Sequence, residues 1–174
     1  RAEVFKAVRR FARAGARISF DPNLRAELLS GRSVSSLIGP VLDSCSVLLP
    51  GERELQLLSG LEDLDRAAER LLARPPLETI AVKRGSRGAT VYSRAGKLEV
   101  PSYRVQEVDP TGAGDCFDAA FLCGLLEGLS LQECARNGAA AGALNAAAFG
   151  PMEGDILPET IRALRAAQDP PPSG

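Results

Sequence analysis

The sequence of 174 residues is 45% hydrophobic and carries a formal net charge of −1 from 21 basic and 22 acidic residues. A chain of this length and composition can bury one core, and its balanced charge favours neither nucleic acid nor an acidic membrane as a partner. The longest apolar run, residues 138–149, is shorter than the roughly 18 residues of a membrane span, and no signal peptide is visible. We therefore expect a cytoplasmic protein with a small-molecule partner.

Four cysteines stand in apolar surroundings without any Cys-x-x-Cys spacing: Cys45, Cys116, Cys123 and Cys134. The chain contains no histidine, so a zinc site has few candidate ligands. Reduced thiols in the core are the favoured interpretation, which agrees with the cytosol.

The first half of the chain alternates helical and strand-like segments. Val4, Val8 and Phe11 recur at helical spacing before Gly15, which predicts a helix over residues 2–14 that ends at a glycine. Further segments follow in the order strand 16–20, helix 34–42, strand 45–50, helix 51–60, helix 64–72 and strand 78–83. Strands joined by helical crossovers predict a mainly parallel sheet with helices on both faces.

The second half begins with three strand-like runs separated by short glycine-containing links: 79–83, 88–93 and 97–102. Such links suit hairpins, so we expect an antiparallel hairpin edge on the sheet. Three helices are predicted after it, over 112–127, 131–148 and 158–167. The whole pattern predicts an α/β domain over residues 1–168, and the Pro-rich tail 169–174 is expected to be disordered.

Two of these helices carry the Gly-xxx-Gly spacing of membrane helices, at Gly124 with Gly128 and at Gly138 with Gly142. Charged and polar residues such as Glu127 interrupt any span. The favoured interpretation is a small-residue face that lets two helices of a soluble domain pack closely, formed by Ala135, Ala139, Gly142, Ala143 and Ala146.

Residues 108–117, VDPTGAGDCF, place a turn, two glycines and an acid at the start of a predicted helix. The first amides of a helix lack intrahelical partners and glycine lets a phosphate approach the backbone, so this segment predicts an anion site. Neither the GxxxxGK[ST] P-loop nor the GxGxxG dinucleotide fingerprint is present. Asp115 would repel a bound anion, which leaves two interpretations open: a base that accepts a proton from an attacking hydroxyl, or an acid that caps the helix.

The segment VDPTGAGDCFDAAF resembles the C-terminal signature of the ribokinase-like carbohydrate kinases, the PfkB family. In that family the Asp that closes GAGD is the catalytic base, and the amides before it form an anion hole for the transferred phosphoryl group. The resemblance implies Asp115 as base and the backbone of Gly112, Ala113 and Gly114 as the hole. Asp109 matches an acid placed near the sugar and, in some members, at a monovalent-cation site for K⁺.

Two further segments resemble the nucleotide-binding side of these kinases. KRGSRGA, residues 83–89, is similar to a hairpin in which Lys83, Gly85 and Gly88 would lie along ATP. NAAAFGPMEG, from Asn145, is similar to the segment beside the adenine, where we place Asn145. Taken alone, the first is a basic turn typical of a solvated hairpin, and Asn145 is a residue that forms a helix hydrogen bond.

The metal and substrate positions also have counterparts. LLPGERELQLLSG is similar to the family's NxxE region, whose Glu acts on Mg²⁺ through water, and Glu54 falls in its place. Gly51 stands where the family has Asn, which weakens the metal assignment, and a solvated helix acid is the alternative for Glu54. FDPNLRAELL is similar to the DxNxR segment of fructokinase and 2-keto-3-deoxygluconate kinase relatives, in which Asn23 and Arg25 would face the substrate.

The resemblance covers only the C-terminal half of a family member, without the N-terminal sugar site and lid. It implies an ATP-dependent sugar kinase that phosphorylates a hydroxyl of a hexose or keto-sugar acid, with ATP and Mg²⁺ and, in some members, K⁺. The alternative is a non-catalytic nucleotide-binding or interaction module derived from such a kinase. Alone, the chain is expected to be inactive and to expose a sheet edge and an apolar face; a homodimer of the full-length protein is left open.

Overall fold

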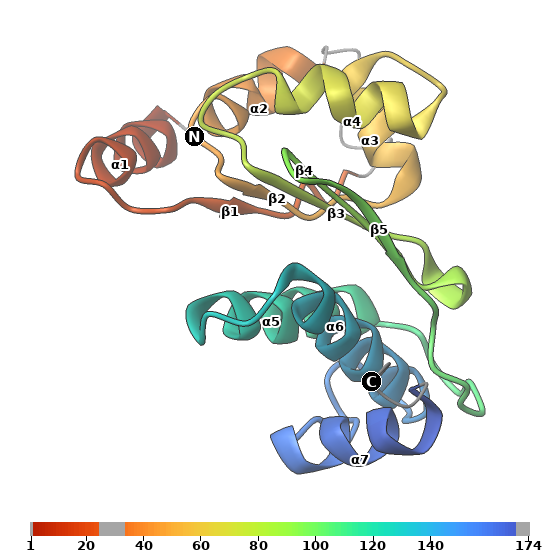
Figure 1. Cartoon of the computed structure of the whole chain (residues 1–174). Coiled ribbons are helices and arrows are strands. Elements are labelled where there is room, and N and C mark those ends of the chain that lie inside the picture. The colour runs from red at the N-terminus through yellow and green to blue at the C-terminus, as the bar shows by residue number, and fades with distance from the viewer. Residues whose placement is uncertain (1, 25–33, 170–174) are drawn as a thin grey trace. The chain divides into compact units, whose positions relative to one another are not determined.

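The computed structural model describes residues 2–24 and 34–169 (Figure 1). Its helices are α1 (Ala2–Arg13), α2 (Val34–Leu42), α3 (Glu52–Ser59), α4 (Leu64–Leu72), α5 (Ala113–Leu126), α6 (Leu131–Ala146) and α7 (Pro158–Gln168). Its strands are β1 (Ser19–Phe20), β2 (Val47–Leu48), β3 (Thr79–Lys83), β4 (Ala89–Ser93) and β5 (Gly96–Val100), with a short 3₁₀ helix η2 (Gly85–Arg87) between β3 and β4. Each predicted helix and strand has a counterpart among these elements.

The strands form one sheet in the order β1-β2-β3-β4-β5. β1 pairs with β2 and β2 with β3 in parallel, with Ser19 opposite Val47 and Val47 opposite Thr79. β4 and β5 are joined by only two residues, a link too short for a parallel crossover, so they form a hairpin. The predicted α/β class, with parallel strands and a hairpin edge, is confirmed.

The chain divides into two compact units: Arg1–Lys83 with Val91–Lys97, and Arg84–Thr90 with Leu98–Gly174. In the first unit, α3 and α4 lie over one face of the sheet (Figure 1). Apolar side chains of these helices are buried against those of β2, β3 and β4. The centre of this core is fully enclosed, and it includes Leu48, Leu55, Ala67, Leu71, Ile80 and Val82. It holds the ends of the parallel strands in place.

Local chemistry sets where these helices begin and end. Asp63 caps α4 by accepting a hydrogen bond from the Arg66 amide (2.8 Å), and Ser130 caps α6 by accepting one from the Glu133 amide (3.2 Å). α3 ends at Gly60, whose φ of 73° is the left-handed conformation typical of a helix C-terminus.

α1 contrasts with the enclosed helices. None of its residues is buried, and Val4 and Phe11 are 57% and 60% exposed. The amphipathic pattern that predicts this helix therefore leaves apolar side chains uncovered, in line with the expected apolar face.

In the second unit, α5 and α6 pack closely through small residues. A Cβ at Gly138 would lie 2.9 Å from the Phe117 ring, and one at Gly124 would lie 2.9 Å from the Cys134 Sγ. Phe117 stacks on Phe121 with ring centroids 5.9 Å apart. The predicted close packing of these two helices is confirmed. None of the described helices has the length and apolar character of a membrane span.

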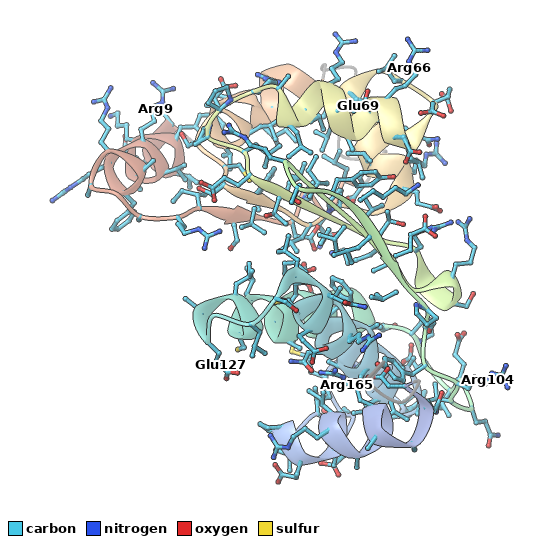
Figure 2. The ribbon with its side chains drawn as sticks, viewed as in Figure 1. Arg9, Arg66, Glu69, Arg104, Glu127 and Arg165 are labelled. Carbon is cyan, nitrogen blue, oxygen red and sulfur yellow. The ribbon has the colours of Figure 1, made fainter. Side chains whose placement is uncertain are left out.

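α7 is attached to α6 by charged side chains. Arg165 lies between the two helices (Figure 2) and donates to Glu133 Oε2 over 2.6 Å and to Asn137 Oδ1. Asp169 accepts hydrogen bonds from Tyr103 and from Arg165 Nε. Asp169 therefore belongs to the folded unit rather than to the predicted disordered tail, and residues 170–174 lie outside the described residues.

Candidate functional site

The turn that leads into α5 presents unbonded backbone amides. Gly112 is the N-cap of α5 and has a φ of 81°, a left-handed conformation that glycine adopts readily. The Ala113 amide donates to the Pro110 carbonyl (3.1 Å), so it differs from the prediction that made it part of an anion hole. Within the described residues, the amides of Gly112, Gly114 and Asp115 have no acceptor. These three amides are therefore the ones available to an anion.

Asp115 lies in the first turn of α5 with an exposed side chain. In the part of the chain that the structure describes, its carboxylate has no hydrogen bond and no ion pair, and the N-cap receives no side-chain hydrogen bond. A capping acid would bond to the backbone of the first turn. The geometry thus gives the capping interpretation no support and leaves the carboxylate accessible.

Asp109 holds the turn before α5 through hydrogen bonds that its carboxylate accepts from two backbone amides. Its Oδ1 accepts from the Thr111 amide (2.9 Å) and its Oδ2 from the Gly150 amide (3.1 Å). These donors, above all Thr111, hold the pKa of the Asp109 carboxyl below its ordinary value, so that it stays ionised. Asp109 thereby joins the turn before α5 to the loop after α6.

Asn145 takes a place that sequence reasoning did not assign to it. Its side chain is fully buried, and its Nδ2 donates to the Thr111 carbonyl over 2.8 Å. The loop after α6 packs tightly here, because a Cβ at Gly154 would lie 2.6 Å from the Asn145 Cα. The contact with adenine stays a prediction, while the structure shows a bond to the turn before α5.

The hairpin between β3 and β4 contains the predicted nucleotide-side glycines. Gly85 (φ 57°) begins η2, and Gly88 (φ 85°) ends it with its carbonyl accepting from the Arg84 amide (2.9 Å). A Cβ at Gly88 would lie 2.1 Å from the Val100 carbonyl oxygen. Packing alone therefore requires glycine at 88, and its place along ATP stays a prediction.

Glu54 and Gly51 lie in the first unit at the start of α3. The Glu54 carboxylate accepts from the Gly51 amide (2.7 Å) and from the Leu24 amide (2.5 Å), which ties the loop after β1 to α3. Glu54 is therefore a capping residue, and each of its oxygens keeps a lone pair. Among the described residues, no group of three acids or cysteines is placed to hold a metal ion.

Lys83 and Asn23 also lie in the first unit. Lys83 Nζ contacts Asp21 Oδ2 at 3.0 Å, and both side chains are largely buried. Asp21 Oδ1 accepts from the Asn23 amide (3.1 Å), and Asn23 has a φ of 39°. Arg25, the second predicted substrate residue, lies outside the described residues.

A cavity of about 570 Å³ opens beside Asp115 in the second unit. One wall is the α5 face that carries Cys116, Ala119 and Cys123, and the opposite wall includes Ile161 of α7. Glu127, the residue that follows α5 (Figure 2), also lines the cavity. Asp115 therefore borders an open, mainly apolar cavity.

Two contacts of the predicted site residues escaped sequence reasoning. Asp21 is the partner of Lys83, and the Thr111 carbonyl is the acceptor of Asn145. The Asp-Pro-Asn order at 21–23 predicts only a local turn and does not indicate the first contact, which joins residues that are 62 positions apart. No sequence signal indicates the second, because it joins residues that are 34 positions apart.

The model of the pfkB family carbohydrate kinases matches residues 1–158. The chain belongs to this family of carbohydrate kinases.

The relatives are about twice as long as the matched region. Fructokinase-1 of Oryza sativa subsp. japonica is 33% identical over 160 residues, which cover 87% of this chain and 49% of the fructokinase. A ribokinase II from E. coli, solved with ATP and Mg²⁺, is 36% identical with a TM-score of 0.87 over 94% of this chain and 53% of that one. A fructokinase of Vibrio cholerae O395, solved with fructose, ADP and potassium, is 25% identical with a TM-score of 0.83 over 94% and 55%. The chain thus spans about half the length of the relatives it matches.

Proposed function

We propose that the protein containing this chain is an ATP-dependent sugar kinase that transfers the γ-phosphoryl group to a hydroxyl of a hexose or keto-sugar acid. The observation that carries the proposal is the start of α5, where an exposed carboxylate stands beside backbone amides, and none of these groups has a hydrogen-bond partner within residues 2–24 and 34–169. Membership of the carbohydrate kinase family supports it.

In this proposal the backbone amides stabilise the transferred phosphoryl group and the Asp115 side chain accepts a proton. The amides of Gly112, Gly114 and Asp115 donate to the oxygens of the phosphoryl group as negative charge accumulates on them. Asp115 accepts the proton of the attacking hydroxyl, a task that a weak base can perform when the proton leaves late. The unbonded amides fit a phosphate, and the exposed carboxylate fits a general base.

The proposed cofactors are those bound in the similar structures, ATP and Mg²⁺ in the ribokinase II and potassium in the fructokinase. ATP would supply the phosphoryl group and Mg²⁺ would neutralise its charge. Glu54 would bind metal-coordinated water through the lone pairs that its two amide contacts leave free. Lys83, Gly85 and Gly88 are proposed along ATP, and Asp109 near a K⁺ site, as the potassium-bound fructokinase suggests.

The substrate class rests on the segment after β1. Asn23 and Arg25 are proposed to face the sugar, and a guanidinium can bind a carboxylate through two parallel hydrogen bonds. This is the reason for including keto-sugar acids beside neutral hexoses.

One observation favours a second candidate function. Gly51 replaces the Asn of the family's metal region, and Glu54 is already bonded to two amides. A chain that had lost metal use could persist as a nucleotide-binding or interaction module without catalysis. The accessible Asp115 carboxylate has no role in such a module, so we favour the kinase.

The test is a coupled ADP-release assay on the intact protein with hexoses, pentoses, nucleosides and keto-sugar acids. The kinase proposal predicts sugar-dependent ADP release of about 1 s⁻¹ or faster with at least one substrate. Nucleotide binding by calorimetry without any sugar-dependent turnover would favour the module instead.

A further inference from the structure

The end of α6 holds the turn before α5 with three hydrogen bonds. The Ala146 carbonyl accepts from the amides of Val108 (2.8 Å) and Asp109 (3.1 Å). The side chain of Asn145 adds the third bond, from Nδ2 to the Thr111 carbonyl at 2.8 Å. Asn145 itself is fully buried, so its amide cannot turn towards solvent. The Thr111 carbonyl is therefore held towards α6.

This bond also decides where the Gly112 amide points. The Thr111 carbonyl and the Gly112 N–H belong to one planar trans peptide group, in which they point in opposite directions. Holding the carbonyl towards α6 therefore directs the N–H away from α6. That N–H is one of the three amides without an acceptor among the described residues.

Because residue 112 is glycine, its own conformational preference does not fix the orientation of the Thr111–Gly112 peptide. A flip of the Thr111–Gly112 peptide changes the φ of residue 112, and glycine adopts positive and negative φ about equally well. Its present φ of 81° therefore has little intrinsic preference over the flipped form. Packing limits the space for a side chain, since a Cβ at Gly112 would lie 3.3 Å from Pro151, but it does not fix the peptide plane.

The cost of Asn145 to stability supports a functional reason for it. Its Oδ1 is buried without a hydrogen-bond partner among the described residues. A buried polar atom without a partner is destabilising, so an apolar residue would suit this position better if packing were all that mattered. The amide is retained where it orients one peptide group.

We propose that Asn145 is a positioning residue that locks the Thr111–Gly112 peptide, so that the Gly112 N–H points into the anion site. Its effect on catalysis rests on the proposed kinase function, whereas the lock itself does not. The residue touches neither substrate nor nucleotide in this role, and acts through the peptide that it holds.

The kinetic test compares Asn145→Ala and Asn145→Asp in the intact protein, with Asn137→Asp on the same helix as control. Loss of an anion-hole donor lowers kcat by about 10²–10³, so we expect Asn145→Ala to lower kcat about tenfold or more while KM for ATP changes little. In Asn145→Asp, a protonated carboxyl can donate to Thr111 as the amide does, and burial raises its pKa. Its kcat relative to the wild type should therefore rise at least about fivefold from roughly pH 8 to pH 6.

Taking the ratio to the wild type at each pH removes any pH dependence of kcat that all variants share. The relative kcat of Asn145→Ala and of Asn137→Asp should not change with pH. A flat ratio for Asn145→Asp, in samples that circular dichroism shows to be equally folded at both pH values, would overturn the proposal.

A second readout does not need activity. The backbone amide resonance of Gly112 should shift or broaden in Asn145→Ala and remain in place in Asn137→Asp, because only the first releases the peptide. An unchanged Gly112 resonance in Asn145→Ala would overturn the lock. If the wild type phosphorylates no sugar but the Gly112 resonance moves as expected, the kinase function fails and the lock stands.

Discussion

Gly51 stands where the proposed correspondence with the family's metal region would put Asn, and its backbone does not require glycine. Its φ of −76° and ψ of 169° are ordinary extended values, and an added Cβ would meet only Glu54 Oε2 at 3.5 Å. A larger side chain can therefore be placed there without strain. The departure is a chemical one, the loss of a carboxamide beside Glu54.

Gly51→Asn should accordingly strengthen Mg²⁺ binding without straining the backbone at this position. The added amide can hydrogen-bond metal-bound water, and such outer contacts change metal affinity by about 10–100-fold. We expect the Mg²⁺ concentration for half-maximal turnover to fall by roughly threefold or more, measured by titrating Mg²⁺ in the ADP-release assay. Gly51→Ala is the control, because it adds a Cβ without the amide. An equal fall in both variants would show that the carboxamide is not the cause.

The four cysteines should differ in reactivity according to burial. Burial raises the pKa of the Cys45 thiol to about 12, and it also raises the pKa of Cys116 and Cys134. A raised pKa leaves less of the reactive thiolate at a given pH. Cys123 is exposed. We expect a disulfide reagent at about pH 8 to label Cys123 in the folded chain well before the others, and Cys123→Ser to lose the fast phase. A fast phase that survives in Cys123→Ser would contradict this order.

At the scale of single residues, sequence reasoning located the functional segment but not its contacts. The glycines and Asp115 at the start of α5 followed from the pattern of residues 108–117. The pattern did not predict that the Ala113 amide is hydrogen-bonded, because this bond to the Pro110 carbonyl depends on the conformation of the turn. The pattern also did not predict the hydrogen bond from Asn145 to Thr111, because tertiary packing brings these two residues together.

At the scale of elements, the hairpin between β3 and β4 depends on one close approach. Gly88 combines a φ of 85° with the carbonyl of Val100 where a Cβ would lie. Gly96 has a φ of 128°, but open space surrounds it. Both glycines have a positive φ, but only Gly88 lacks space for a side chain. Comparing the two therefore distinguishes the effect of backbone conformation from the effect of packing.

Gly88→Ala should destabilise the chain more than Gly96→Ala does. Both variants place alanine in a strained conformation that costs about 1–3 kcal/mol, and only Gly88→Ala also forces a clash with the Val100 backbone. We expect the free energy of unfolding to fall by at least about 1 kcal/mol more in Gly88→Ala, measured by urea denaturation of both variants and the wild type. Equal losses would mean that the β5 backbone moves away freely.

Helices and strands were predicted well, and their ends less well. α2 and α4 begin and end where the apolar pattern predicts, because their faces pack on one core. β1 and β2 are shorter than the predicted strands, since only two residues of each are paired in register. Pairing depends on the neighbouring strand, which a single segment of sequence does not reveal.

At the scale of the whole molecule, the chain has the start of α5 but spans about half the length of its relatives. Catalysis requires the acceptor hydroxyl within roughly 3–3.5 Å of the phosphorus and exclusion of water from the site. We therefore expect residues 1–174, expressed alone, to bind ATP weakly if at all and to phosphorylate no sugar. Calorimetry and the ADP-release assay, with the intact protein as reference, measure both. Sugar-dependent turnover near about 1 s⁻¹ by residues 1–174 alone would contradict this prediction.

The role of Asp115 as base is tested by Asp115→Asn in the intact protein. The substitution keeps the shape of the side chain and removes its basicity, so kcat should fall by on the order of 10²–10⁴ while the Kd for ATP stays within about twofold. Glu69→Gln, at an exposed acid of α4 that does not line the cavity beside Asp115, is the control and should turn over like the wild type. A kcat for Asp115→Asn within a few-fold of the wild type would show that another group accepts the proton and that the carboxylate at the start of α5 is not the catalytic base.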